Sequence, residues 1–364
     1  GVMNDLVSNF HLEHTALGHL TSAVQFGFIS GTLLFALFTI VDRFSPYMVF
    51  LISAMAGAFF NVCLIWEGNG LASLLTFRFF TGFFLAGIYP VGMKIAADYY
   101  DKGLGKSLGF LVGALVVGTA FPHLLKGFTG VLSWKLVLVG TSCLAVMGGL
   151  LMILLVPNGP FRKASQKMDI SAFFKVFNNK DFRSAAFGYF GHMWELYAFW
   201  AFVPVFLSTY KMIYPESMLN IPILSFLIIG IGGIACILGG YISLQAGTKR
   251  TAFIALFLSC LCCISSPLVF LIDSSIFMLA FLFFWSMVVI ADSPLFSTLV
   301  AHNALAESKG TALTIVNCMG FSITIISIQL LNLLQELMNP RYIYIVLALG
   351  PIFGLIALYD KKNN

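Results

Sequence analysis

Charged side chains are scarce in this chain. They make up 10% of its 364 residues, whereas soluble domains carry about 25%. Hydrophobic residues make up 59%, and so few polar side chains cannot cover the surface of a water-soluble globule. The chain is therefore expected to be a polytopic membrane protein with most of its outer surface in lipid. In such a protein the position of the charges matters more than the net charge of +5, which does not indicate nucleic-acid binding.

Motifs for metal, nucleotide and catalytic chemistry are also missing. The seven cysteines lie in apolar runs without metal-ligand spacing, so neither a zinc site nor a disulfide framework is expected. The sequence has no G-x-x-x-x-G-K-[ST] loop for ATP phosphates. The run Gly230-Ile231-Gly232-Gly233 is not framed by a strand or an acid, and it is interpreted as close helix packing. No catalytic residue, cofactor, metal ion or nucleic-acid partner is expected.

Long apolar runs, in contrast, are abundant. A membrane-spanning helix needs roughly 20 apolar residues, and eleven runs of about this length are bounded by charge, Pro or Gly. Transmembrane β-strands alternate in polarity, whereas these runs do not, so the spans are predicted to be helices. They cover approximately residues 17–40, 47–65, 71–97, 107–125, 134–156, 184–208, 222–244, 250–272, 276–299, 311–334 and 341–359.

Lys and Arg residues gather in the loops on one side of these spans, for example at Arg43, Lys106 and Lys249. By the positive-inside rule these loops face the cytoplasm, in a bacterial inner membrane or a plasma membrane. An odd number of spans then places residue 1 outside and the C-terminus in the cytoplasm. Because the chain begins with Gly1 and not Met, we expect a first helix to be missing and the native protein to have twelve.

A polar stretch divides the chain into two halves. Residues 157–183 are predicted to be a cytoplasmic linker between an N-terminal bundle, residues 1–156, and a C-terminal bundle, residues 184–364. Asp169 can cap a short linker helix. Its apolar stripe either lies on the inner membrane surface or packs on the ends of the bundles.

Short motifs recur in the two halves. Tyr89-Pro90 and Ser293-Pro294 lie 204 residues apart, as do Asp98 and His302. Further motifs are the loop Asp42-Arg43 and the sequence R-x-x-x-G from Arg78 to Gly82. In their order, spacing and duplication these motifs resemble the major facilitator superfamily of secondary transporters. The resemblance implies an all-α fold of two pseudo-symmetric six-helix bundles, of which this chain would hold helices 2–6 and 7–12.

The resemblance also implies a conformational latch in the cytoplasmic loops. Asp42 and Arg43 would form it, with Asp98 as a partner for Arg43. Alternatively these residues form a solvated turn that contributes under about 1 kcal/mol.

Three charged residues lie well inside predicted spans: Arg78, Glu195 and Asp292. A charge near the bilayer centre costs at least about 2.5 kcal/mol on insertion scales, so these side chains should face protein or water. The resemblance places them on helices 4, 7 and 10, around a central cavity.

Arg78 either binds a substrate anion or ties helices together. Glu195 is the candidate proton carrier and His192, one helical turn away, a relay; alternatively the two form a hydrogen-bonded pair that fixes helix packing. Asp292 precedes Ser293-Pro294, where the helix is expected to break or kink. It would bind a coupling ion or a substrate ammonium, or stabilise the kink.

Aromatic residues complete the predicted substrate site. Tyr89, Tyr197 and Trp285 join Arg78 and His192 as candidate binding residues, and Trp194 and Trp200 as further wall residues. Anchoring at the lipid interface or core packing explains any single one equally well.

The sequence thus predicts a monomeric, proton-coupled secondary transporter that moves a small organic solute by alternating access. Arg78 slightly favours uptake of an organic anion. The alternatives are proton-driven efflux of cationic or drug-like compounds, and a membrane receptor or enzyme that does not transport.

Overall fold

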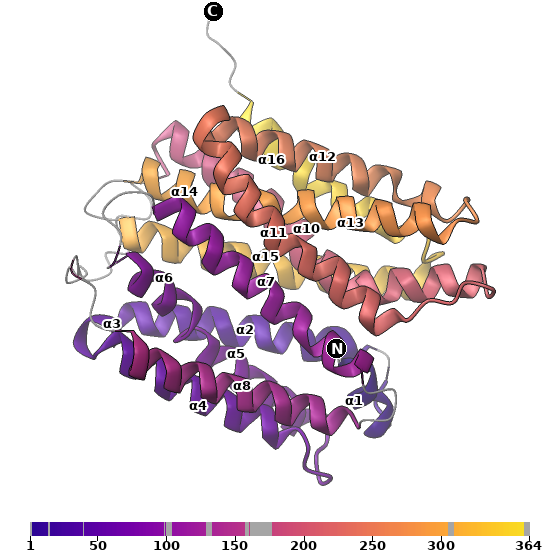
Figure 1. Cartoon of the computed structure of the whole chain (residues 1–364), viewed down its shortest axis with the longest axis horizontal. Coiled ribbons are helices and arrows are strands. Elements are labelled where there is room, and N and C mark those ends of the chain that lie inside the picture. Colours follow the sequence, from indigo (N-terminus) through magenta and orange to yellow (C-terminus); the bar gives the residue numbers. More distant parts are fainter. Residues whose placement is uncertain are drawn as a thin grey trace, which may run out of the picture.

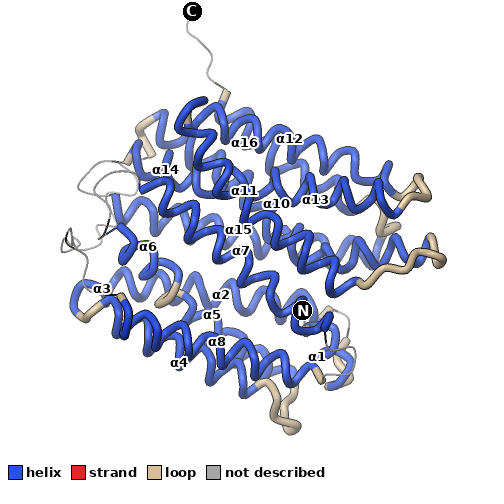
Figure 2. The backbone as a smooth tube through the Cα atoms, in the orientation of Figure 1, coloured by secondary structure: helices blue, strands red, loops and turns tan. Residues whose placement is uncertain are grey.

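All regular elements of the structure are helices, in the residues that it describes (Figure 2). It is a computed structural model, and it describes residues 2–13, 15–38, 40–97, 99, 104–128, 133–156, 160, 177–304 and 309–359. Within this part, ten helices are long and apolar enough to cross a membrane, and Ile343–Leu358 forms a shorter apolar helix. The all-α polytopic fold predicted from the sequence is confirmed.

The outer surface is apolar, as a lipid-facing surface must be. Large hydrophobic side chains point outward along the helices, for example Leu154, which is 75% exposed, and Ile356, which is 70% exposed. Burying these side chains in lipid is what makes the scarcity of charge in the sequence tolerable.

The first group of helices precedes the linker. Its members are α1 (Met3–Asn9), α2 (Ala16–Leu37), α3 (Ile40–Arg43), α4 (Pro46–Cys63), α5 (Leu71–Leu85), α6 (Tyr89–Ala97), α7 (Leu104–Phe128) and α8 (Trp134–Leu155). Within it α2 packs against α5, and α4 packs against both α5 and α8.

The second group follows the linker. Its members are α10 (Lys180–Ile213), α11 (Ile221–Ala246), α12 (Thr248–Val269), α13 (Ser275–Ala291), α14 (Ser293–Asn303), α15 (Lys309–Leu337), the 3₁₀ helix η2 (Ile343–Ala348) and α16 (Leu349–Leu358). Here α11 packs against α13, and α12 against η2 and α16. These contacts repeat those of α2 with α5 and of α4 with α8, so the two groups are arranged alike.

The two groups meet along two helix pairs. The pair α7 and α11 crosses the middle of Figure 1, and α2 packs against α15. At the first crossing a Cβ atom added to Gly113 would lie 2.9 Å from the carbonyl oxygen of Gly233, and the reverse distance is the same. The glycine run around Gly233 therefore serves close helix packing, as the sequence indicates.

An apolar cluster closes the space between the groups at one end. It joins Phe28 and Ala86 of the first group to residues of α10, α14 and α15. The rings of Phe28 and Phe321 lie 4.4 Å apart, centroid to centroid. This end is the one that carries α6 and α14 (Figure 1).

One predicted span in each half is broken by a short turn ahead of a proline. The first break separates α5 from α6 just before Pro90, and the second lies at Asp292, between α13 and α14, just before Pro294. Proline lacks a backbone N–H and clashes with the preceding turn, so a continuous helix is disfavoured at both places. The expected break at Asp292 is observed, and its repeat-related position is broken as well.

The residues of the predicted latch are only partly described. Arg43 is exposed at the end of α3, whereas the side chain of Asp42 and the whole of Asp98 lie outside the described residues. Asp169 and most of the linker also lie outside them. The latch and the linker helix stay predictions.

The packing of α2 against α5 gives a direct test of the fold. A Cβ atom at Gly82 would clash with the carbonyl oxygen of Val24, so Gly82→Ala must push the two helices apart. We expect a loss of about 1–3 kcal/mol in the free energy of unfolding, as is typical of overpacking. Gly148→Ala is the matched control, because no atom lies within 4 Å of a Cβ there. Equal stability of the two purified variants in thermal unfolding would contradict the packing described.

Candidate functional site

A cavity of about 560 Å³ lies between the two groups of helices. This volume falls in the range typical of small-molecule sites, about 300–1,000 Å³. Residues of α2, α4, α5, α7 and α8 line it on one side, and residues of α10, α11 and α15 on the other. It reaches Lys126 and Ile221, at the end of the molecule opposite the apolar cluster around Phe28.

The polar groups that line the cavity come mostly from the first group of helices. They are Thr21, Gln25, Asn61, Arg78, Thr81, Thr119, His123, Lys126, Thr141 and Ser142, whereas the second group contributes Tyr197, Trp200, Ser208, Ser225 and Asn332. Among the described lining residues there is no Asp or Glu. The charged groups of the wall are therefore cationic.

Arg78 is held in place by the contact between α2 and α5. Its Nε donates a hydrogen bond to the carbonyl oxygen of Leu20 on α2, at 3.3 Å. The close approach of the two backbones at Gly82, one turn further on, brings that carbonyl within reach. Within the described part of the chain no acidic side chain pairs with Arg78. The remaining donors of its guanidinium fork are left for water or a ligand.

The second cation of the wall differs from the first. Lys126 of α7 forms an ion pair with Asp5 of α1, so its charge is largely compensated. Gln25 of α2 is only 8% exposed and lines the cavity. It makes no hydrogen bond to the described residues, so its amide is available to water or a ligand in the cavity. Arg78 and Gln25 can therefore both offer hydrogen bonds to a solute in the cavity.

Glu195 lies in a separate, sealed site within the second group of helices. Its Oε1 accepts hydrogen bonds from Ser259, from Cys263 at 3.2 Å and from Trp285 Nε1 at 2.6 Å. These partners come from α12 and α13, and Glu195 is fully buried. Its Oε2 has no partner among the described residues.

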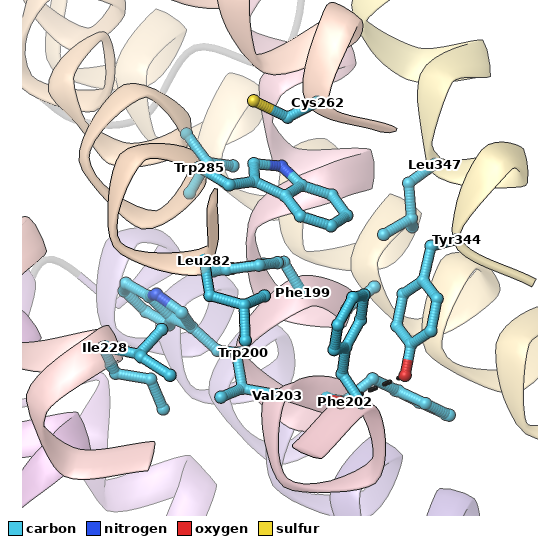
Figure 3. Packing of buried hydrophobic residues seen from close by; sticks show 14 of the residues in the cluster. Phe199, Trp200, Phe202, Val203, Ile228, Cys262, Leu282, Trp285, Tyr344 and Leu347 are labelled. Carbon is cyan, nitrogen blue, oxygen red and sulfur yellow. Dashed lines mark hydrogen bonds between the residues drawn. The ribbon is translucent and has the colours of Figure 1, made fainter. Parts of the chain in front are cut away.

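A layer of apolar side chains separates this site from the cavity wall. In Figure 3 the side chains of Phe199 and Leu282 lie between Trp285 and Trp200. The rings of Phe199 and Trp285 lie 4.7 Å apart, centroid to centroid. Trp285 is thus a core residue that binds Glu195, and it does not line the cavity.

His192 and Asp292 form a second buried pair. Nδ1 of His192 lies 2.8 Å from Oδ1 of Asp292, and both side chains are 1% exposed. Because Asp292 occupies the break between α13 and α14, the pair ties that break to α10. Neither residue lines the cavity.

Of the residues predicted from the sequence to bind substrate, the structure places Arg78 and Tyr197 in the cavity wall, together with the wall candidate Trp200. Tyr89, His192 and Trp285 do not line it, and the indole N–H of Trp194 donates to the carbonyl oxygen of Val346. Sequence reasoning missed four polar wall residues, Gln25, Asn61, His123 and Lys126. It also missed two partners of Glu195 outside the wall, Ser259 and Cys263. The last two lie four residues apart, which places them on one face of α12.

Comparison with known proteins gives one match. The sequence model of the family described as Major Facilitator Superfamily matches residues 1–328. No curated protein matches the chain.

Thiol labelling distinguishes the cavity from the sealed interior. Ser208 lines the cavity, whereas Ser266 is 0% exposed within the second group of helices. In a chain whose native cysteines are replaced, we expect Ser208→Cys to react with a water-soluble thiol reagent and Ser266→Cys to stay unmodified. The yield is read by mass spectrometry of the intact protein. Labelling of both, or of neither, would show that the cavity is not where the structure has it.

Proposed function

The chain belongs to the Major Facilitator Superfamily and is a multi-pass membrane transporter, not an enzyme, and from this premise we propose that it carries a small organic anion. The observation that supports this proposal is the guanidinium of Arg78. It faces the cavity without an acidic partner in the described part of the chain, and no described Asp or Glu lines that cavity.

The charge argument favours an anion because an unpaired cation in low dielectric is costly. Withdrawing a charge from water costs several kcal/mol unless it is paired. Arg presents planar donors that match a carboxylate in two parallel hydrogen bonds. A bound carboxylate would therefore supply the missing partner, as no described protein group does.

Efflux of cationic compounds is the weaker alternative. A cationic solute would meet Arg78 and Lys126 with no lining acid, among the described residues, to offset their charge. Glu195 and Asp292, the acids that favoured this alternative in the sequence, are both 0% exposed and lie behind the wall.

Alternating access fits the two helix pairs at which the halves meet. In this proposal the halves rock about the contacts of α2 with α15 and of α7 with α11, around a central site. The positively charged loops orient the apolar cluster around Phe28 toward the cytoplasm. The cavity then opens to the outside, and the conformation is the one that receives solute for uptake.

Proton coupling is proposed to involve Glu195, with His192 and Asp292 as a second titratable pair. Glu195 accepts its three hydrogen bonds on Oε1, so Oε2 can take a proton without displacing them. On α10, Glu195 lies two residues before Tyr197 of the cavity wall. A change in the charge of the Glu195 carboxyl group can therefore affect Tyr197 through this short stretch of helix. In this proposal the coupled proton binds next to the substrate site and not within it.

Replacement of Arg78 tests the anion proposal. Hydrogen bonds to charged groups contribute about 1.5–3 kcal/mol, so Arg78→Gln should weaken binding of an anionic solute roughly 10- to 100-fold. Binding is measured by calorimetry on purified protein, with solutes found in a thermal-shift screen of carboxylates, phosphonates, amines and amides. The control is Lys135→Gln, since Lys135 pairs with Glu67 and does not line the cavity. Tight binding of amines, or anion binding that survives Arg78→Gln, would overturn the proposal.

Replacement of Glu195 tests proton coupling. Glu195→Gln keeps an acceptor for Trp285 but cannot exchange a proton, so uptake into proteoliposomes should lose its acceleration by an inward proton gradient while solute exchange persists. Glu216→Gln is the control, because Glu216 is exposed in the loop before α11. If transport by Glu195→Gln keeps the proton dependence of the unmodified protein, Glu195 is not the carrier and serves only to hold α10, α12 and α13 together.

A further inference from the structure

The two sides of the cavity differ in chemical character. The permanent positive charges, on Arg78 and Lys126, belong to α5 and α7. The facing stretch of α10 is aromatic and aliphatic, and the residues that it contributes to the lining are Tyr197, Trp200, Ala201, Phe202, Pro204, Val205 and Ser208. A ligand that spans the cavity therefore meets a cation at one side and an apolar wall at the other.

The aromatic part of that wall is built as a rigid unit. The rings of Tyr197 and Trp200 lie 5.2 Å apart at an interplanar angle of 70°, and Tyr197 lies 5.2 Å from the ring of Phe321 on α15. The first of these pairs has the edge-to-face arrangement that aromatic rings prefer. Their mutual contacts fix the wall before a ligand arrives, which lowers the entropic cost of binding.

Polar atoms on this wall lack partners. The indole Nε1 of Trp200 is buried without an acceptor among the described residues, and no described residue is hydrogen-bonded to the hydroxyl of Tyr197. Tyr and Trp usually find a hydrogen-bond partner when they are buried. Tyr197 is only half-buried, so its hydroxyl is open to water or to a ligand in the cavity. The indole N–H of Trp200 is enclosed, and core packing alone leaves it unexplained.

The charge of the ligand follows from the balance of the cations. Lys126 is already paired with Asp5. Arg78 has no acidic partner in the described part of the chain, so one permanent positive charge is left uncompensated. One negative charge on the ligand would balance it, whereas a dicarboxylate would bring a second charge against the apolar face of α10, where desolvation is unfavourable.

We propose that the ligand of this cavity is an amphipathic monocarboxylate, whose carboxylate binds Arg78 and whose aromatic or branched apolar body packs against Tyr197 and Trp200. This inference rests on the proposed anion site and adds the class of solute that fills it. The volume of about 560 Å³ accommodates an aromatic acid, whereas a two-carbon acid would leave most of the space to water.

Binding of simple probes tests the inference on the purified full chain in nanodiscs. The probes are benzoate, phenylacetate and 3-phenylpropanoate, compared with acetate, succinate and the neutral analogue benzamide. We expect the best aromatic acid to bind at least tenfold more tightly than acetate and succinate. Benzamide should bind at least tenfold more weakly than benzoate.

Variants of Trp200 and Tyr197 measure how much each side chain contributes to the binding of aromatic acids. Trp200→Ala should remove most of the preference for aromatic acids over acetate, while Trp200→Phe should retain most of it because the ring surface remains. Tyr197→Phe should weaken aromatic acids severalfold at most. Trp66→Ala is the control, since Trp66 is 64% exposed and does not line the cavity.

The outcomes distinguish this inference from the anion proposal. If Arg78→Gln abolishes binding but acetate or succinate binds as tightly as the aromatic acids, the anion site stands and the amphipathic ligand is wrong. An unchanged preference in Trp200→Ala, or no binding of any of the three aromatic acids, also overturns it. If benzamide binds as tightly as benzoate, or aromatic acids bind equally well after Arg78→Gln, the anion site itself is wrong.

Discussion

An unpaired guanidinium inside a membrane protein is the constraint on which this structure depends. A cation near the bilayer centre is tolerated only where protein, water or a ligand solvates it. Arg78 has one backbone carbonyl as its protein partner in the described residues, so the rest of its charge must be met from the cavity. That requirement explains the hollow between the two helix groups and the absence of lining acids among the described residues, and it is the basis on which we propose an anion as the solute.

The two halves have similar helix arrangements but carry different functional groups. In the first half, glycines let α2 and α5 approach until the carbonyl of Leu20 reaches Arg78. In the second half the acids Glu195 and Asp292 are enclosed among α10, α12, α13 and α14. We therefore interpret the first half as the solute-binding side and the second half as the side where protons are held, separated by the packed rings around Phe199.

The sequence predicts the helices and the break at Asp292 well, because apolar runs and prolines act locally, but it does not predict the break between α5 and α6. The sequence also predicts that Arg78 faces the cavity, because a cation in an apolar span must be solvated. It does not predict which face of α10 meets the cavity, because that rotation is set by packing against other helices, chiefly α14, α15 and α16. Glu195 and Tyr197 are two residues apart, so they point about 200° from each other around the helix. One of them had to face away from the site, and the contacts with Ser259 and Trp285 decide that it is Glu195.

Chemical protection of Arg78 tests the central claim most directly. Phenylglyoxal modifies accessible guanidinium groups, and the extent of modification at Arg78 can be read by peptide mass spectrometry with the exposed Arg43 as the internal reference. The account predicts that Arg78 is modified in the empty protein, that a carboxylate solute protects it, and that the neutral amide of the same shape does not. Equal protection by acid and amide, or no protection by either, would contradict it.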